Sequence, residues 1–327
     1  MVGDAHTQAG LPRDLERVFP LPVSKFDDDY RIALVPPGLE KALGARIVSI
    51  DDTPAERFYS LLSPLVPQDE NPTFAPAVVN LLLSQAQVLH GAGITKQTNA
   101  ARYTLEDETG RQFTLDVQAL GVEEYAKIIW VPIARAPRLK EISEPMHNPS
   151  PMFTYTYIPQ ARTVFANVRK MVDVKEPGNE LIKFIRERQP EKVIIDLRAN
   201  VGGDYFQGLH GLVEPISKLA EINQKGHLFV LIGPLTSSAA VINAAQFHTM
   251  TNAILVGQPI GEKPSEYAEH REMTLPRTHI SVGYSVRFYD FAYNKENIVK
   301  PDHEVRYSWD DFKHGINPAL EWCLAYK

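Results

Sequence analysis

The sequence predicts an α/β fold with a largely parallel sheet that is covered by helices. Two observations support this. The chain has 327 residues, of which 44% are hydrophobic and 23% charged, so it has the composition of a globular protein and the length of two or three domains. After residue 152, strand-like and helix-like segments alternate, which favours parallel strands joined by helical crossovers.

The first third of the chain predicts a smaller α+β region. Pro54 lies near the first position of a helix (PAERFYSLL), and the periodicity of 75–89 makes it the clearest helix in the chain. The expected elements are two strands within 28–50, helices at 54–62 and 75–89, and strands at 100–106 and 111–118 around the turn DETGR.

A stretch rich in proline, residues 134–151, has little periodicity, and we interpret it as a linker to a second region, 152–327. The elements expected in that region are strands at 152–158, 162–169, 192–197, 227–232 and 253–257, helices at 178–188, about 205–223, 238–250 and from Pro318, and hairpin strands at about 267–275 and 279–289.

Composition excludes several classes of protein. A net charge of −6 argues against a nucleic-acid-binding protein, and no apolar run approaches the roughly 18 residues of a membrane span. The single cysteine, Cys323, rules out an intrachain disulfide and lies in an apolar stretch, where we expect it to be buried. Apart from His6, discussed below, the histidines show no metal-ligand spacing, so we expect no metal or cofactor. The start of the chain lacks the basic and apolar regions of a signal peptide.

Two loops that follow predicted strands could carry chemistry, because ligands of α/β sheets collect at the carboxyl ends of the strands. They are DLRANVGGD (196–204) and GPLTSSAA (233–240). A serine at the start of a helix lies beside unpaired backbone N–H groups, which could stabilise an oxyanion. For Ser238 the natural donor is the amide of Ala239, and Gly202 or Gly203 could supply a second one.

Each loop also has a purely structural interpretation. Thr236, Ser237 or Ser238 could cap the following helix, and Gly202-Gly203 could form a tight strand-to-helix turn. Considered separately, neither loop distinguishes catalysis from helix capping or turn formation.

Considered together, the motifs are more specific. The segments VIIDLRANVGGD, LFVLIGPLTSSAAVINA and AILVGQPIGEKPSEY resemble, in this order, the C-terminal processing (tail-specific) serine peptidase family. The family includes the tricorn core protease and the retinoid-binding repeats. The resemblance covers about 152–327 and implies a ClpP/crotonase-like spiral core there, acting as the catalytic domain. LGARIVSIDDTPAERFYSLL (43–62) resembles part of the PDZ-like module of the family, which implies a PDZ-like module with a helical insertion at 28–133.

The resemblance also implies roles for individual residues. Ser238, which precedes Ala-Ala, matches the nucleophile, with the amides of Ala239 and of Gly202 or Gly203 as oxyanion donors. Thr236 or Ser237 would then be free to cap the helix.

Two residues match the general base in different branches of the family. Lys263, in GEK, matches the lysine of the Ser–Lys processing proteases, a role that requires an uncharged amine in a dry pocket. His6, in VGDAHTQ, matches the histidine of the tricorn-like branch, in which Glu296 would be the supporting glutamate. Imidazole titrates near neutral pH and needs little adjustment for this role.

The start of the chain resembles a truncated relative. Residues 1–27 would be the remnant of an N-terminal cap segment that carries the GDAHT motif. Relatives are often exported, so the lack of a visible signal peptide leaves the compartment open. Val241, Gln258 and Ile260 depart from the family pattern without touching the proposed nucleophile, and Asp204 follows the double glycine where Asn is common.

These features predict a serine endopeptidase of the tail-specific type, which would hydrolyse a peptide or protein substrate through an acyl-enzyme on Ser238. The substrate could be engaged through its C-terminus. One alternative is a non-catalytic ligand- or peptide-binding protein of the same fold, and another is a crotonase-like acyl-CoA enzyme.

Overall fold

The computed structural model describes residues 4–68, 70–133 and 152–327. The predicted linker at 134–151 lies outside these ranges. No helix in the described part of the chain is both long and apolar enough to cross a membrane.

A six-stranded sheet forms the core of the C-terminal region, in the order β12-β13-β14-β15-β16-β19. Only β12 is antiparallel to its neighbour, so the prediction of a largely parallel sheet is confirmed. The strands are β12 (Phe153–Ile158), β13 (Thr163–Val168), β14 (Lys192–Asp196), β15 (Leu228–Ile232), β16 (Ile254–Gly257) and β19 (His303–Glu304).

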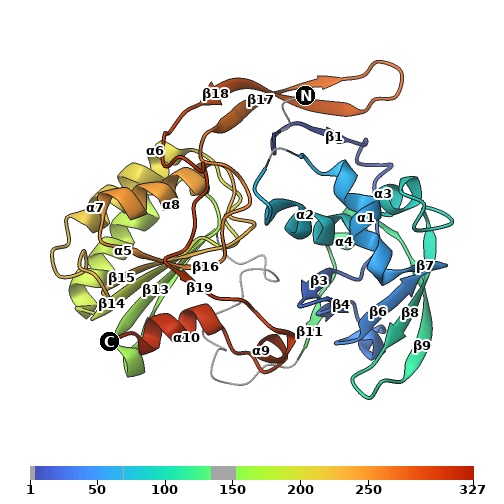
Figure 1. The fold of residues 1–327 in the computed structure, drawn as a ribbon, viewed down its shortest axis with the longest axis horizontal. Helices are drawn as coiled ribbons and strands as arrows, with labels where there is room; N and C mark the ends of the chain where they lie inside the picture. Colours follow the sequence, from blue (N-terminus) through green and yellow to red (C-terminus); the bar gives the residue numbers. More distant parts are fainter. Residues whose placement is uncertain (1–3, 69, 134–151) are drawn as a thin grey trace.

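Helices cover both faces of this sheet and make three layers (Figure 1). One face carries α5 (Lys175–Arg188), α6 (Tyr205–Gly208), α7 (Glu214–Ser217) and α8 (Ala239–Met250), and the other carries α10 (Pro318–Ala325). Successive residues of a strand point to opposite faces, so Val230 packs under α8 whereas Phe229 packs against α10. Cys323 of α10 is fully buried, as predicted.

The N-terminal region contains a second, antiparallel sheet in the order β3-β4-β6-β8-β9, with β7 paired to β6. Its strands are β3 (Val23–Phe26), β4 (Asp29–Ile32), β6 (Arg46–Ile50), β7 (Thr53–Pro54), β8 (Ala100–Glu106) and β9 (Gln112–Gln118). Three helices pack on it around a core of its own: α1 (Phe58–Leu62), α2 (Phe74–Leu82) and α3 (Ala86–Gly91). Short elements complete the region: β2 (Arg17–Val18), β5 (Leu34–Val35), β10 (Leu120–Gly121), β11 (Val131–Pro132) and α4 (Val122–Tyr125).

Two predicted helices are interrupted. The helix expected at 75–89 is two helices, because Gln85 has an extended backbone between α2 and α3. The helix expected at 205–223 ends at Ser217 and includes a π-helical segment, η6 (Leu209–Val213), between α6 and α7. Apolar periodicity continues across both interruptions, so it could not reveal them.

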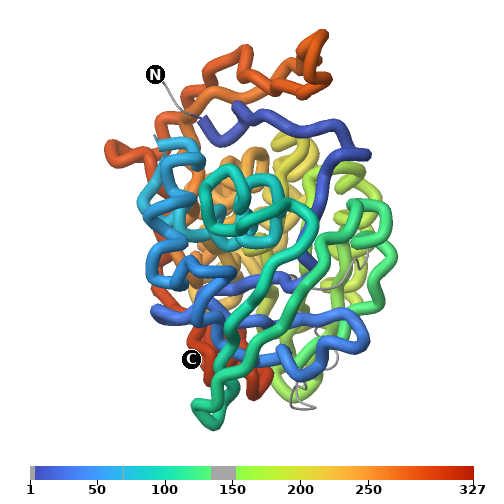
Figure 2. The backbone as a smooth tube through the Cα atoms, turned by 90° about the vertical axis from the view of Figure 1, so that its right-hand side faces the viewer, coloured from blue at the N-terminus to red at the C-terminus, as the bar shows by residue number. Residues whose placement is uncertain are grey.

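A long hairpin, β17 (Glu266–Thr274) and β18 (Ser281–Tyr289), extends from the C-terminal region over the N-terminal one (Figure 1). Strand β1 (Gln8–Gly10) pairs antiparallel with β18 and forms a three-stranded sheet with the hairpin. Figure 2 shows the N-terminal segment running beneath the hairpin. Two helices follow β19: α9 (Trp309–Lys313) and α10. The pairing of β1 with β18 joins residues 8–10 to residues 281–283, which are far away in the sequence.

Candidate active site

Ser238 lies in the connection between β15 and α8, at the carboxyl edge of the parallel sheet. Its backbone has φ 53° and ψ −124°, a region that non-glycine residues rarely adopt. Such strain persists only where the surrounding structure enforces it, and it is common at active sites. Ser238 occupies the N-cap position of α8, but its hydroxyl makes no capping hydrogen bond. The hydroxyl is therefore available for other chemistry.

The neighbouring hydroxyls also do not cap α8, contrary to the expectation for Thr236 and Ser237. The Thr236 hydroxyl donates to the carbonyl of Leu197 and accepts from the amide of Gly233, which fixes the loop against the end of β14. The Ser237 hydroxyl donates to Glu262 Oε1 at 2.5 Å. Both side chains thus hold the loop in place.

His6 contacts Ser238 although 232 residues separate them in the sequence. The distance from His6 Nε2 to Ser238 Oγ is 3.1 Å, and 16% of the His6 side chain is exposed. The segment before His6 is held by Asp4, whose Oδ1 accepts hydrogen bonds from the His6 amide and, at 2.6 Å, from the Ser285 hydroxyl of β18. The hairpin therefore positions the histidine beside the serine.

Glu266, at the start of β17, faces the other ring nitrogen of His6. Its Oε1 lies 3.9 Å from His6 Nδ1, and its side chain is only 10% exposed. Neither His6 Nδ1 nor Glu266 Oε2 has a hydrogen-bond partner among the described residues, although both atoms are buried. Burial, together with the negative charges of Glu262, Glu70 and Asp4, raises the pKa of Glu266 to about 10.

Two more glutamates connect the loops around the site. Glu262 is 5% exposed and accepts a hydrogen bond from the Ser238 amide at 2.5 Å, in addition to that from Ser237. Burial raises the pKa of Glu262, whereas these two hydrogen bonds oppose the rise. Glu70 accepts from the amides of Ala5 and Lys263, and burial together with the charge of Glu262 raises its pKa to about 7.

Sequence reasoning missed these carboxylates. Glu262 lies in the GEK motif beside Lys263, and Glu266 follows four residues later, but nothing in the sequence marks them as buried. Asp4 belongs to the GDAHT motif, which was the one available signal for its position. Glu70 lies within the polar loop VPQDENPTF (66–74), where nothing in the sequence indicates a position near the serine.

The double glycine lies directly against the serine. A Cβ atom added to Gly202 would be 2.6 Å from Ser238 Cβ and 3.2 Å from the Ala239 amide nitrogen, so only glycine fits. The Gly202 amide already donates to Asn200 Oδ1 at 2.9 Å. Within the described hydrogen bonds, the amides of Gly203 and Ala239 have no acceptor. This favours Gly203 over Gly202 as the partner of Ala239 in an oxyanion hole.

Lys263 and Glu296, the other predicted residues, are not part of the His6–Ser238 contact. The amide of Lys263 donates to Glu70 Oε2 at 3.0 Å. The Glu296 side chain is 64% exposed and pairs with Lys300, four residues later in the sequence, so it does not occupy the predicted place beside His6. Glu266 occupies that place.

His6, Glu262 and Glu266 also form a group that could hold a metal ion. One ligand atom from each lies within 4.8 Å of the other two. An imidazole nitrogen with two carboxylates is a donor set that suits first-row transition metals.

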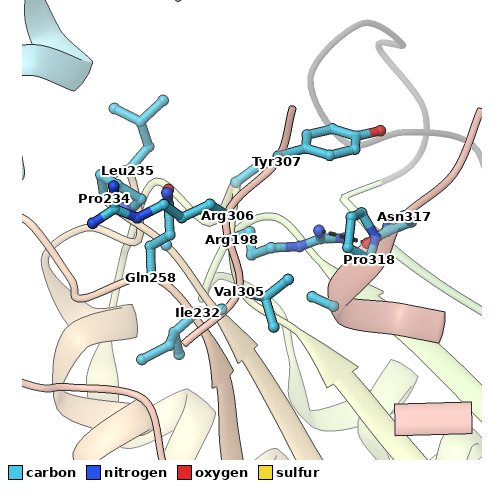
Figure 3. Close-up of a pocket in the computed structure, with 14 residues that line it drawn as sticks. Arg198, Ile232, Pro234, Leu235, Gln258, Val305, Arg306, Tyr307, Asn317 and Pro318 are labelled. Atoms are coloured by element: carbon cyan, nitrogen blue, oxygen red, sulfur yellow. Dashed lines mark hydrogen bonds between the residues drawn. The ribbon is translucent and has the colours of Figure 1, made fainter. Parts of the chain in front are cut away.

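A pocket of about 180 Å³ lies beside the start of the loop that carries Ser238 (Figure 3). Pro234 and Leu235 contribute from that loop, and Pro318 and Asn317 from the start of α10. The Arg198 guanidinium at this pocket is already bonded to Asp196 and Asn317. The DLR motif therefore has a structural role, since it joins the end of β14 to α10.

No family model and no curated protein sequence matches the chain. Among solved structures, mature CPAF has a TM-score of 0.61 with 13% identity, covering 98% of this chain and 83% of that one. CPAF complexed with lactacystin has a TM-score of 0.61 with 12% identity, covering 95% and 82%. A weaker likeness, with a TM-score of 0.41 and 14% identity, is to the photosystem II D1 C-terminal processing protease, covering 93% and 78%. The chain therefore shares the fold of CPAF.

Proposed function

We propose that this chain is a serine peptidase of the tail-specific type. The observation that carries the proposal is the 3.1 Å contact between His6 Nε2 and Ser238 Oγ. A nucleophile and a base within hydrogen-bond reach, with a third group beside the base, is the arrangement of nucleophilic hydrolases. The motif resemblance and the shared fold agree with it.

In this mechanism the Ser238 hydroxyl attacks the scissile carbonyl while His6 Nε2 takes its proton. The amides of Ala239 and Gly203 stabilise the oxyanion, since neither N–H group donates to an acceptor among the described hydrogen bonds. His6 then gives its proton to the leaving amine. Water, activated by the same imidazole, releases the acyl group from Ser238.

Glu266 is the positioning residue for His6. For Nε2 to accept a proton, the hydrogen of the neutral ring must reside on Nδ1, which faces Glu266 at 3.9 Å. Contacts of this kind are often longer without substrate and shorten in the complex. We assign proton transfer to His6 rather than Lys263, because His6 Nε2 lies within hydrogen-bond reach of Ser238 Oγ.

The substrate of this mechanism is a peptide or protein. The antiparallel sheet at 23–118, with its three helices, is the candidate PDZ-like module, and we propose that it binds or gates the substrate, through the substrate's C-terminus. Binding by strand addition to a sheet edge would suit an extended peptide.

A fluorophosphonate probe tests the nucleophile. It should label the wild-type chain once, and Ser238→Ala should abolish the label. The control is Ser60→Ala, which removes an exposed hydroxyl bonded to the Arg57 carbonyl and should leave labelling intact. A chain that stays unlabelled while binding peptides would support the non-catalytic alternative.

The base is tested by the same labelling rate and by peptide hydrolysis. His6→Ala should reduce both by roughly 10⁴-fold or more, whereas Lys263→Ala should retain most activity. His210→Ala, which removes a surface histidine paired with Glu214, is the matched control. Full activity without His6 and loss without Lys263 would overturn this assignment in favour of lysine.

A further inference from the structure

The carboxyl groups of Glu262, Glu266, Glu70 and Asp4 gather near His6, and among them Glu266 has a buried oxygen without a hydrogen-bond partner in the described structure. Glu262 and Glu266 are about nine-tenths buried or more, and Glu70 and Asp4 lie close enough to raise the pKa of Glu266 through their charges. Yet two buried ligand atoms there, His6 Nδ1 and Glu266 Oε2, have no hydrogen-bond partner in the described structure. Unpartnered buried polar atoms are costly. At 3.9 Å, His6 Nδ1 and Glu266 are too far apart to satisfy each other in this arrangement, and a cation between them could pair with both.

The geometry points to a divalent transition-metal site, and we propose that His6 Nδ1, Glu266 and Glu262 bind Zn²⁺ in a way that reversibly switches off Ser238. One donor atom from each residue already lies within 4.8 Å of the others. A tetrahedral zinc ion with bonds of about 2.1 Å holds its donors about 3.4 Å apart, so small side-chain rotations would complete the site. Water or Glu70 would supply the fourth ligand.

The donor set selects the class of metal. An imidazole nitrogen with carboxylate oxygens suits Zn²⁺ and its first-row neighbours. Mg²⁺ and Ca²⁺ prefer six or more oxygen ligands, which three side chains including an imidazole do not provide. The Glu262 oxygens that accept from Ser237 and Ser238 still have lone pairs for a metal, since each carboxylate oxygen has two.

Zinc at this position would disable the base through the tautomer of the ring. A neutral imidazole that gives the Nδ1 lone pair to a metal must carry its only N–H hydrogen on Nε2. Nε2 would then donate to Ser238 Oγ and could not accept the serine proton. The inhibitory effect, unlike zinc binding itself, rests on the proposed peptidase function.

Calorimetric titration of ZnCl₂ into the chelator-treated full chain tests binding without activity. The Ser238→Ala variant is the titrated protein, because it keeps all three ligands and cannot digest itself. One zinc ion per chain is expected. His6→Ala and Glu266→Gln should each weaken binding at least tenfold, and 1 mM Mg²⁺ should not compete.

The surface pair His210 and Glu214, one helical turn apart, is the matched control, since it is the kind of site where zinc binds adventitiously. His210→Ala should leave the titration unchanged. The proposal fails if zinc does not bind at millimolar concentration, if His210→Ala removes the binding, if Mg²⁺ competes, or if His6→Ala leaves it intact. The His6→Ala arm remains informative if Glu266→Gln does not fold, because His6 lies outside the hydrophobic cores.

With wild-type protein, zinc should inhibit fluorophosphonate labelling with the midpoint measured by calorimetry, and EDTA should restore it. Binding without any labelling in EDTA would contradict the peptidase function while retaining the metal site. Labelling that zinc does not affect would contradict the inhibitory role.

Discussion

The two sides of the candidate active site are held in place by different means. Ser238 and the double glycine follow β15 and β14, adjacent strands of a buried parallel sheet. Backbone contacts such as the hydrogen bond from the Ser237 amide to the Asn200 carbonyl fix them, together with the hydroxyls of Thr236 and Ser237. His6 instead lies on a short segment before the three-residue strand β1, and side-chain contacts with Asp4, Ser285 and Glu70 hold that segment.

The two sides should therefore differ in how well they tolerate substitution. The Ser238 side is part of the sheet, so a change there disturbs the core that packs on the sheet. The base side is attached by a few polar contacts, and such contacts each contribute about 1–3 kcal/mol. We therefore expect changes on the first side to affect stability and activity together, and changes on the second to affect activity more than stability.

The largest effect on stability is expected from Gly202→Ala. The new methyl group would lie 2.6 Å from Ser238 Cβ, and φ is +87°, so the variant should lose about 3 kcal/mol of unfolding free energy and at least 100-fold in labelling rate. Gly110→Ala is the matched control, because Gly110 has φ +82° and no atom within 4 Å of the added Cβ. Gly110→Ala should lose only about 1 kcal/mol of unfolding free energy, which is the cost of placing alanine at a positive φ. If urea unfolding shows equal losses of unfolding free energy for the two variants, the close contact between residue 202 and Ser238 is not what makes Gly202 necessary.

A smaller effect is expected from Ser285→Ala, which removes the 2.6 Å hydrogen bond to Asp4. Loosening the His6 segment should slow fluorophosphonate labelling about tenfold, the equivalent of about 1.4 kcal/mol, with little change in thermal unfolding. Ser281→Ala, in the same strand, removes a hydroxyl that bonds to exposed Glu272 and should not slow labelling. A drop in melting temperature that parallels the loss of labelling would show that the two sides are not independent.

A third effect concerns pH. Burial raises the pKa of Glu70 to about 7 from 4.5, so between these values the native state holds a proton that the unfolded chain has lost. Stability therefore falls as pH rises through this window. Glu70→Gln should remove on the order of 2 kcal/mol of that fall between pH 5 and 8, measured by urea unfolding in EDTA.

The control for the pH experiment is Glu40→Gln. Hydrogen bonds from the backbone lower the pKa of this exposed carboxylate, so its contribution is lost only as pH falls below about 4.5. The fall between pH 5 and 8 should be the same as in the wild type. A Glu70→Gln variant that shows the wild-type fall would contradict the buried position of Glu70.

The same contrast explains what the sequence could predict. The α/β class and the parallel sheet follow from the alternation of strand-like and helix-like segments. The loops after β14 and β15 follow from the ends of predicted strands, so the positions of Ser238, Ala239 and the two glycines at these strand ends could be predicted. The predicted PDZ-like module and spiral core stay predictions. The position of Glu266 could not be predicted from the sequence, because it depends on where the β17–β18 hairpin crosses the molecule.

Glu296 shows that a motif position alone can suggest the wrong residue. Motif position favoured it as the partner of His6, yet it is exposed beside Lys300. The interruption at Gln85 and the π-helical segment are similar cases, in which tertiary packing decides a local geometry that periodicity leaves open.

The pairing of β1 with β18 has a consequence during synthesis. The residues that carry His6 are synthesised before the strand that pairs with β1, Ser281–Tyr289. The loops after β14 and β15 also precede that strand in the sequence. The proposed base and nucleophile would therefore come together only after β18 has left the ribosome.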